Sequence, residues 1–117
     1  MKKLIFTLLL SLISYTHNVY AIPNPAAVNC TKVGGKSSIE KLPSGDSIGI
    51  CTFDTNHECE QWALFRKHCP IGGIKTHSLT KEERYCLILG GNIINKTNCT
   101  LPAEKICSLH SLYNNIC

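Results

Sequence analysis

Cysteine is the residue of this sequence whose chemistry is most clearly defined. The chain holds eight cysteines, an even number, and all of them lie from Cys30 onward. In a short chain such a set indicates a disulfide framework. Structural zinc sites usually have Cys-x2–4-Cys spacing, which does not occur here, and a catalytic cysteine needs a free thiolate. We therefore expect eight structural cysteines, with no metal and no cofactor: Cys30, Cys51, Cys59, Cys69, Cys86, Cys99, Cys107 and Cys117.

A second set of reactive side chains surrounds Cys59. Glu58 and Glu60 flank this cysteine, and His57 and His68 lie nearby. Paired carboxylates could support hydrolysis. On a helix, however, residues two apart point to different faces, so we expect Glu58 and Glu60 to be solvated. The histidines show no i, i+4 pairing of the metal-binding type: His57, His68, His77 and His110.

Trp62 is the single tryptophan of the chain. In so small a domain we expect its ring to be half-buried and packed on a hairpin. The alternative is a recognition patch formed with Glu60 and Arg66, because Trp and Arg are frequent in interface hot spots. Neither use requires catalysis, and we do not expect an enzyme.

The cysteine spacing occurs twice. Residues 51–69 and 99–117 align without a gap, and each segment has seven and then nine residues between its three cysteines. Upstream, Cys30-x-x-x-Gly-Gly matches Cys86-x-x-x-Gly-Gly. Two copies of one module explain this pattern better than chance does. We expect a first module over 22–69, a linker over 70–79 and a second, diverged module over 80–117.

Local signals give each module the order helix, β-hairpin, helix, an α+β fold. Asn24 before Pro25 predicts a helix over 25–33, and the capping box from Thr80 to Glu83 predicts one over 81–89. Each helix stops at a Gly pair. The hairpins are expected at 36–41 with 47–52, and at 92–94 with 98–101, the second being eight residues shorter. The closing helices are expected at 57–67 and 104–114.

Pairing within each module still leaves several alternatives, among which we favour Cys30–Cys51, Cys59–Cys69, Cys86–Cys99 and Cys107–Cys117. Ten residues of unbroken helix would separate the Cα atoms of Cys59 and Cys69 by about 15 Å, which is beyond disulfide reach. Cys69 and Cys117 must therefore lie past a helix end.

The N-terminus has the pattern of an export signal. Lys2 and Lys3 precede the apolar stretch 4–13, and Ala21 provides a small residue for cleavage. A stretch of about ten residues is too short to cross a bilayer. We expect residues 1–21 to be removed, which places the mature chain in the periplasm or outside the cell.

The charge balance argues against a polyanionic partner. The formal net charge is +4, and loss of Lys2 and Lys3 with the signal lowers it to +2. The remaining basic residues are scattered along the chain. We therefore expect neither nucleic-acid binding nor stable membrane insertion.

Three motifs of the first module can be compared with known families. They are Asn24-Pro25-Ala26-Ala27-Val28-x-Cys30-x-x-x-Gly34-Gly35, Gly49-Ile50-Cys51 and Glu58-Cys59-Glu60-x-Trp62-Ala63-x-Phe65-Arg66. Residues 24–69 thereby resemble a family of small bacterial domains of unknown function that carries the name hemolysin. The second module has His110 where Trp62 would stand, so it looks like a diverged relative. The resemblance implies an envelope or secreted protein.

Three functions follow in order of preference. The first is a non-enzymatic binding module of the bacterial envelope or secretome, with an unknown protein or envelope partner. The second is a membrane-active toxin, as the family name implies. The third, a small hydrolase, depends on Glu58, Glu60, His57 and His68.

Overall fold

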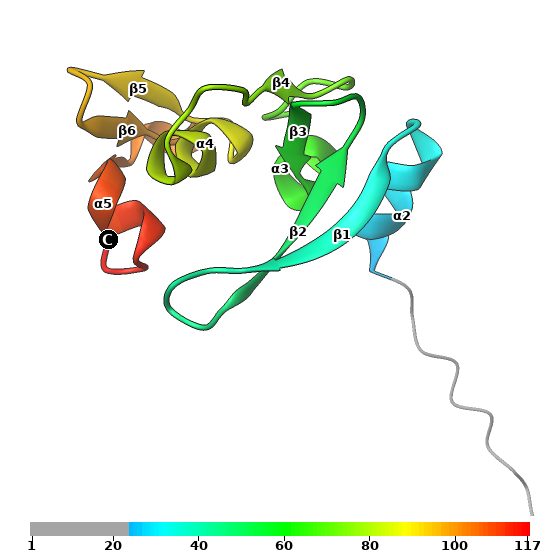
Figure 1. Ribbon diagram of the computed structural model, residues 1–117, viewed down its shortest axis with the longest axis horizontal. Helices are drawn as coiled ribbons and strands as arrows, with labels where there is room; N and C mark the ends of the chain where they lie inside the picture. Colours follow the sequence, from blue (N-terminus) through cyan, green and yellow to red (C-terminus); the bar gives the residue numbers. More distant parts are fainter. Residues whose placement is uncertain (1–23) are drawn as a thin grey trace, which may run out of the picture.

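A computed structural model describes residues 24–117 of the protein, and Figure 1 shows their arrangement. The expected signal and its cleavage at Ala21 lie outside the described residues. The N-terminal half, residues 24–79, contains α2 (Pro25–Lys32), β1 (Lys36–Lys41), β2 (Ser47–Thr52), β3 (His57–Glu60), α3 (Gln61–Phe65) and β4 (Ile74–Lys75). The C-terminal half, residues 80–117, contains α4 (Lys81–Ile88), β5 (Asn92–Ile94), β6 (Asn98–Thr100), the 3-10 turn η1 (Pro102–Glu104), β7 (Ile106–Ser108) and α5 (Leu109–Tyr113).

Four disulfides hold this small fold of mixed helix and sheet. The bonds join Cys30–Cys51, Cys59–Cys69, Cys86–Cys99 and Cys107–Cys117, with Cα–Cα distances of 5.6, 5.9, 5.9 and 6.0 Å. This is the pairing favoured by the sequence, and no described cysteine is free. Each half is too small to bury a large core, and each disulfide contributes about 2–4 kcal/mol by restricting the unfolded chain.

The two helices expected after the hairpins begin later than predicted. His57–Glu60 is strand β3, which pairs with β2 so that Cys59 lies opposite Cys51, and the helix starts only at Gln61. In the C-terminal half, β7 places Cys107 opposite Cys99 before α5 begins at Leu109. The prediction of helices over 57–67 and 104–114 is therefore wrong at their N-terminal ends. A strand keeps the first cysteine beside the sheet, while the second follows the short helix.

The first helices and the hairpins lie where the sequence places them. The Asn24 side chain accepts hydrogen bonds from the backbone N–H groups of Ala26 and Ala27 and so caps α2. Thr80 and Glu83 form both bonds of the capping box that begins α4. The antiparallel sheets have the orders β1-β2-β3-β4 and β5-β6-β7.

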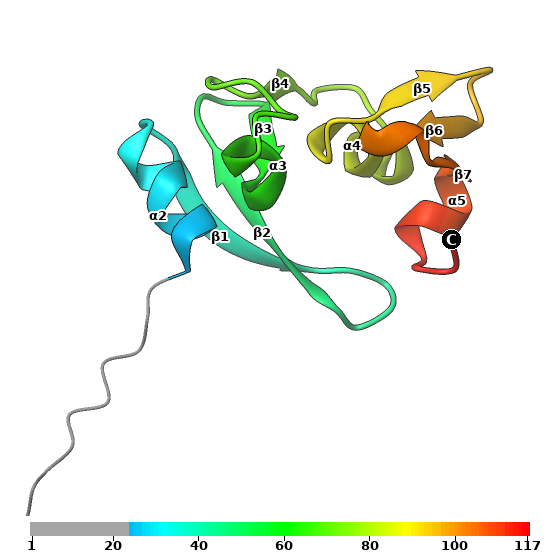
Figure 2. The same ribbon diagram turned by 180° about the vertical axis from the view of Figure 1, so that it is seen from behind.

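The first sheet has a helical side and a side that faces the C-terminal half. Cys51 and Cys59 point to the helical side, where they bond to Cys30 of α2 and to Cys69 after α3. Thr52 and Glu58, the adjacent residues on the two strands, point to the other side because side chains alternate along a strand. Helix α4 contacts β3 there, so the sheet lies between α2 and α3 on one side and α4 on the other (Figure 2).

The β1–β2 hairpin reaches the C-terminal half. At its tip, the Asp46 carboxylate accepts a hydrogen bond from the Asn115 side chain at 3.1 Å. Near α4, the backbone of Gly90 packs so closely against His68 that a Cβ at Gly90 would come within 2.6 Å of the His68 carbonyl oxygen. The first hairpin is longer than the second, and its tip contacts the C-terminal half through Asp46 and Asn115.

Candidate functional site

Glu60 is the residue that starts α3. Its two carboxylate oxygens accept hydrogen bonds from the backbone N–H groups of Trp62 at 3.0 Å and Ala63 at 2.7 Å. The residue is 8% exposed. The expectation of a solvated Glu60 is wrong, because the residue is buried and both of its carboxylate oxygens cap the helix.

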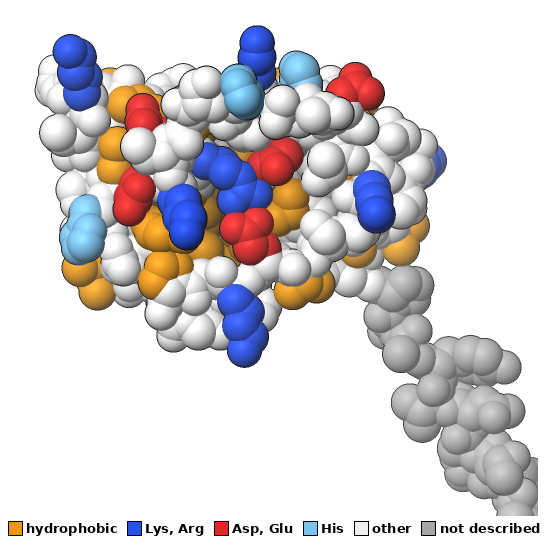
Figure 3. All heavy atoms as spheres, viewed as in Figure 1, with side chains coloured by type: hydrophobic (Ala, Val, Ile, Leu, Met, Phe, Trp, Pro, Cys, Tyr) orange, Lys and Arg blue, Asp and Glu red, His pale blue; other side chains and the backbone are white. Residues whose placement is uncertain are grey.

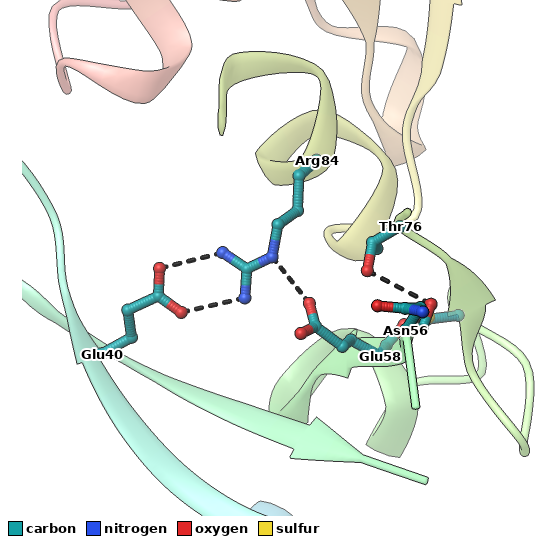
Figure 4. Close-up of polar contacts among 6 residues, drawn as sticks. Glu40, Asn56, Glu58, Thr76 and Arg84 are labelled. Carbon is teal, nitrogen blue, oxygen red and sulfur yellow. Dashed lines mark hydrogen bonds and ion pairs between the residues drawn. The ribbon is translucent and has the colours of Figure 1, made fainter. Parts of the chain in front are cut away.

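Glu58, two residues before Glu60 on β3, is bound by an arginine from the C-terminal half. Arg84 of α4 donates from Nε to Glu58 at 2.6 Å, and from Nη1 and Nη2 to the two oxygens of Glu40 on β1 at 2.9 Å each (Figure 4). We call these three residues the Arg84 cluster. Burial alone would lower the pKa of Arg84, but the hydrogen bonds to Glu40 and Glu58 raise it above its ordinary value.

The Arg84 cluster corrects the expectation that Glu58 is solvated. Sequence reasoning missed it because Glu40, Glu58 and Arg84 come from distant parts of the chain, and no local spacing relates them. Its position between β1, β3 and α4 makes it a connection between the two halves.

Two of the four histidines considered above, His57 and His68, make local contacts within the fold. The Nδ1 atom of His57 lies 3.2 Å from the carbonyl oxygen of Thr55, and His68 packs on Gly90. Within residues 24–117, no group of three His, Cys, Asp or Glu residues is arranged to hold a metal ion. Glu58 and Glu60 thus have separate structural partners and form no paired-carboxylate site.

Trp62 and Arg66, the other members of the expected patch, do meet on the surface of α3. The Arg66 guanidinium lies 5.3 Å from the centre of the Trp62 ring, and Trp62 contacts Phe65 edge-on with ring centres 5.7 Å apart. Trp62 is half-buried, whereas Phe65 and Arg66 are exposed. The structure adds Phe65 to this group; its spacing of three residues from Trp62 on a helix was the available signal.

Next to Phe65, a hollow opens between α2 and α3, which lie side by side (Figure 2). We call it the α2–α3 groove. Its volume is about 150 Å³, and it is lined by Asn29, Val33, Leu64, Phe65, Lys67, Cys69, Pro70 and Ile71. The lining is mostly apolar, includes no carboxylate and has one cation, Lys67. Of these residues, Phe65 and Ile71 are large apolar side chains that remain exposed.

Figure 3 shows how the charged side chains are distributed on one face of the molecule. On the face shown in Figure 3, most Lys and Arg side chains are scattered, and two that lie close together near the centre have carboxylates beside them. This view agrees with the scattered basic residues of the sequence. The α2–α3 groove is therefore the strongest candidate site among the described residues.

Comparison with known proteins identifies the N-terminal half without giving it an activity. Residues 21–68 match the family model described as a domain of unknown function, DUF333. No curated protein and no solved structure matches the chain. The match includes both helices that form the groove. Residues 21–68 are thus a DUF333 domain.

Proposed function

We propose that this protein is an exported binding module that holds an apolar side chain of a partner polypeptide in the α2–α3 groove. The observation that carries the proposal is an open hollow with apolar lining, in which Phe65 and Ile71 remain exposed. Exposed apolar side chains gathered around a hollow are typical of interaction sites.

The volume of the groove limits the size of the group that it can bind. Pockets for drug-sized molecules enclose about 300–1,000 Å³. A volume of about 150 Å³ is closer to a cavity that accepts one benzene ring. One side chain of a peptide or protein therefore fits, whereas a large cofactor does not.

Export is supported by the leader pattern of residues 1–21 together with the disulfides. Four disulfides indicate an oxidising compartment, periplasmic or extracellular. None of the helices in residues 24–117 has the length and apolarity needed to cross a bilayer. A toxin that forms helical pores receives no support from these helices.

The C-terminal half serves in this proposal as a diverged copy that braces the binding half. In both halves a helix is followed by three paired strands and a second helix, and the disulfides follow the same pattern. At the position of Trp62 the C-terminal half has the exposed His110, which no ring contact involves. The Arg84 cluster fixes this half against the sheet on the side away from the groove.

A peptide titration followed by NMR tests the proposal. The oxidised protein is mixed with acetyl-Gly-Leu-Gly-amide or with acetyl-Gly-Gly-Gly-amide. We expect the leucine peptide to shift the signals of Val33, Leu64 and Ile71, and the glycine peptide to leave them in place.

Two matched variants complete the test. Ile71→Asp removes an apolar side chain at the groove and should abolish the shifts. Ile116→Asp makes the same change at a residue of equal exposure, 70% against 71% for Ile71, that does not line the groove. Equal effects of the two variants, or no shifts in the unmodified protein, would contradict the proposed function.

A further inference from the structure

The chain segment that follows α3 brings positive charge to the α2–α3 groove. Arg66, Lys67 and His68 form this segment, and Lys67 is the one charged residue that lines the hollow. Neither of the two salt bridges formed within residues 24–117 includes Lys67. The groove therefore presents a cation beside an apolar hollow that has no carboxylate of its own.

The C-terminal half has a different residue at the backbone position that corresponds to Lys67. Arg66 is the C-cap residue of α3 and Asn114 that of α5. Each is followed by a residue with left-handed φ, 65° at Lys67 and 57° at Asn115. Asparagine adopts this conformation more readily than lysine, because its short polar side chain bonds locally. The N-terminal half thus has a charged residue at a position whose backbone favours asparagine.

We infer that the partner segment carries a carboxylate next to its apolar side chain, and that Lys67 binds this carboxylate. The inference rests on the proposed function and adds the chemistry of the ligand to it. An acidic group beside an apolar anchor matches both features of the groove, the hollow and the unpaired ammonium group.

A peptide fits these observations better than an anionic membrane does. The hollow has the volume of one side chain, whereas stable membrane attachment needs an inserted chain or a broad apolar face together with several basic residues. Lys67 is a single cation at the hollow, and Arg66 next to it is stacked on Trp62.

The test compares two peptides of nearly equal shape, acetyl-Asp-Leu-Gly-amide and acetyl-Asn-Leu-Gly-amide, by NMR titration of the oxidised protein. At low salt we expect the aspartate peptide to bind about fivefold more tightly, the upper range for an exposed ion pair. The difference should disappear in about 0.5 M sodium chloride, which screens exposed charges.

Two glycine variants identify the responsible cation. Lys67→Gly should give both peptides the weaker affinity and should raise the unfolding temperature, because glycine accepts left-handed φ without strain. Lys96→Gly is the matched control. Lys96 also has left-handed φ, 62°, but lies in the β5–β6 turn at the other end of the molecule (Figure 1). The Lys96→Gly protein should also have a higher unfolding temperature, but it should still bind the aspartate peptide more tightly than the asparagine peptide.

The outcomes separate this inference from the proposed function. Equal binding of the two peptides overturns the inference and leaves the proposed function in place. Absence of binding by both peptides overturns both. Binding to phosphatidylglycerol vesicles that depends on Lys67, without peptide binding, also overturns both and identifies a membrane surface as the partner. A lower unfolding temperature of Lys67→Gly would show that Lys67 has a structural role and would overturn the inference.

Discussion

Removal of the guanidinium of Arg84 is the perturbation that most directly tests how the two halves are connected. We predict that Arg84→Met lowers the free energy of unfolding by about 2–3 kcal/mol. Methionine retains an unbranched apolar side chain and therefore much of the packing of the arginine stem, so the loss reports mainly on charge and hydrogen bonding.

The magnitude follows from the burial of the three side chains. Arg84 and Glu58 are 21% and 20% exposed, and a hydrogen bond between charged groups with this burial contributes about 1.5–3 kcal/mol. Glu40 is 39% exposed, so its bidentate pair with Arg84 is screened by solvent and adds at most about 1 kcal/mol. Glu58 and Glu40 would also be left without their cation.

Urea unfolding of the oxidised protein, followed by Trp62 fluorescence and circular dichroism, measures the effect. Glu58→Gln in the Arg84→Met background should recover about 1 kcal/mol, since it removes an unpaired, partly buried carboxylate. Lys81→Met is the control on the same helix, at an exposed residue without an ion pair, and should change stability by less than about 0.5 kcal/mol. If Arg84→Met and Lys81→Met unfold at the same urea concentration, the Arg84 cluster does not connect the halves.

Three further predictions concern the N-terminal half and its contact with α4. Gly49→Ala should destabilise the protein by about 2 kcal/mol or more in urea unfolding, because a Cβ at Gly49 collides with the buried Gln61 side chain; a change below about 0.5 kcal/mol would contradict this packing. Glu60→Ala should cost about 1–2 kcal/mol through loss of the α3 cap, with loss of helix signal in circular dichroism, and an unchanged urea midpoint would refute the capping role. Burial raises the pKa of Tyr85, as do the charges of Glu60 and Asp46 to a smaller extent, so the unfolded state loses this proton first. Stability should therefore fall as pH rises through about 10, and Tyr85→Phe should reduce that slope; equal slopes would contradict the burial of Tyr85.

The parts of the fold that the sequence predicted correctly depend on local signals. The caps at Asn24 and Thr80 depend on side chains within three residues of the bonds they form. The repeated spacing limited the disulfide pairing to a few alternatives, and the favoured one is the pairing found. Strand β3 was missed because its pairing with β2 is a tertiary contact that no local signal at His57 and Glu58 reveals.

The candidate site was only partly predictable, because it depends on tertiary structure. The patch predicted from Glu60, Trp62 and Arg66 lies at α3, where the Glu60 carboxylate is used to cap the helix. The groove joins α2, α3 and the segment around Ile71, which are far apart in sequence. For the same reason, the partnership of Arg84 with Glu58 could not be read from local spacing.

Site-specific photo-crosslinking in the host cell tests the central claim that the α2–α3 groove is the binding surface. A photoreactive amino acid is placed at Ile71, or at Ile116 as the control of equal exposure, and adducts are identified by mass spectrometry. We predict that Ile71 forms a defined adduct with an envelope or secreted polypeptide, through a segment with an apolar side chain, and that Ile116 does not. The same adducts from both positions, or none from Ile71, would contradict the account.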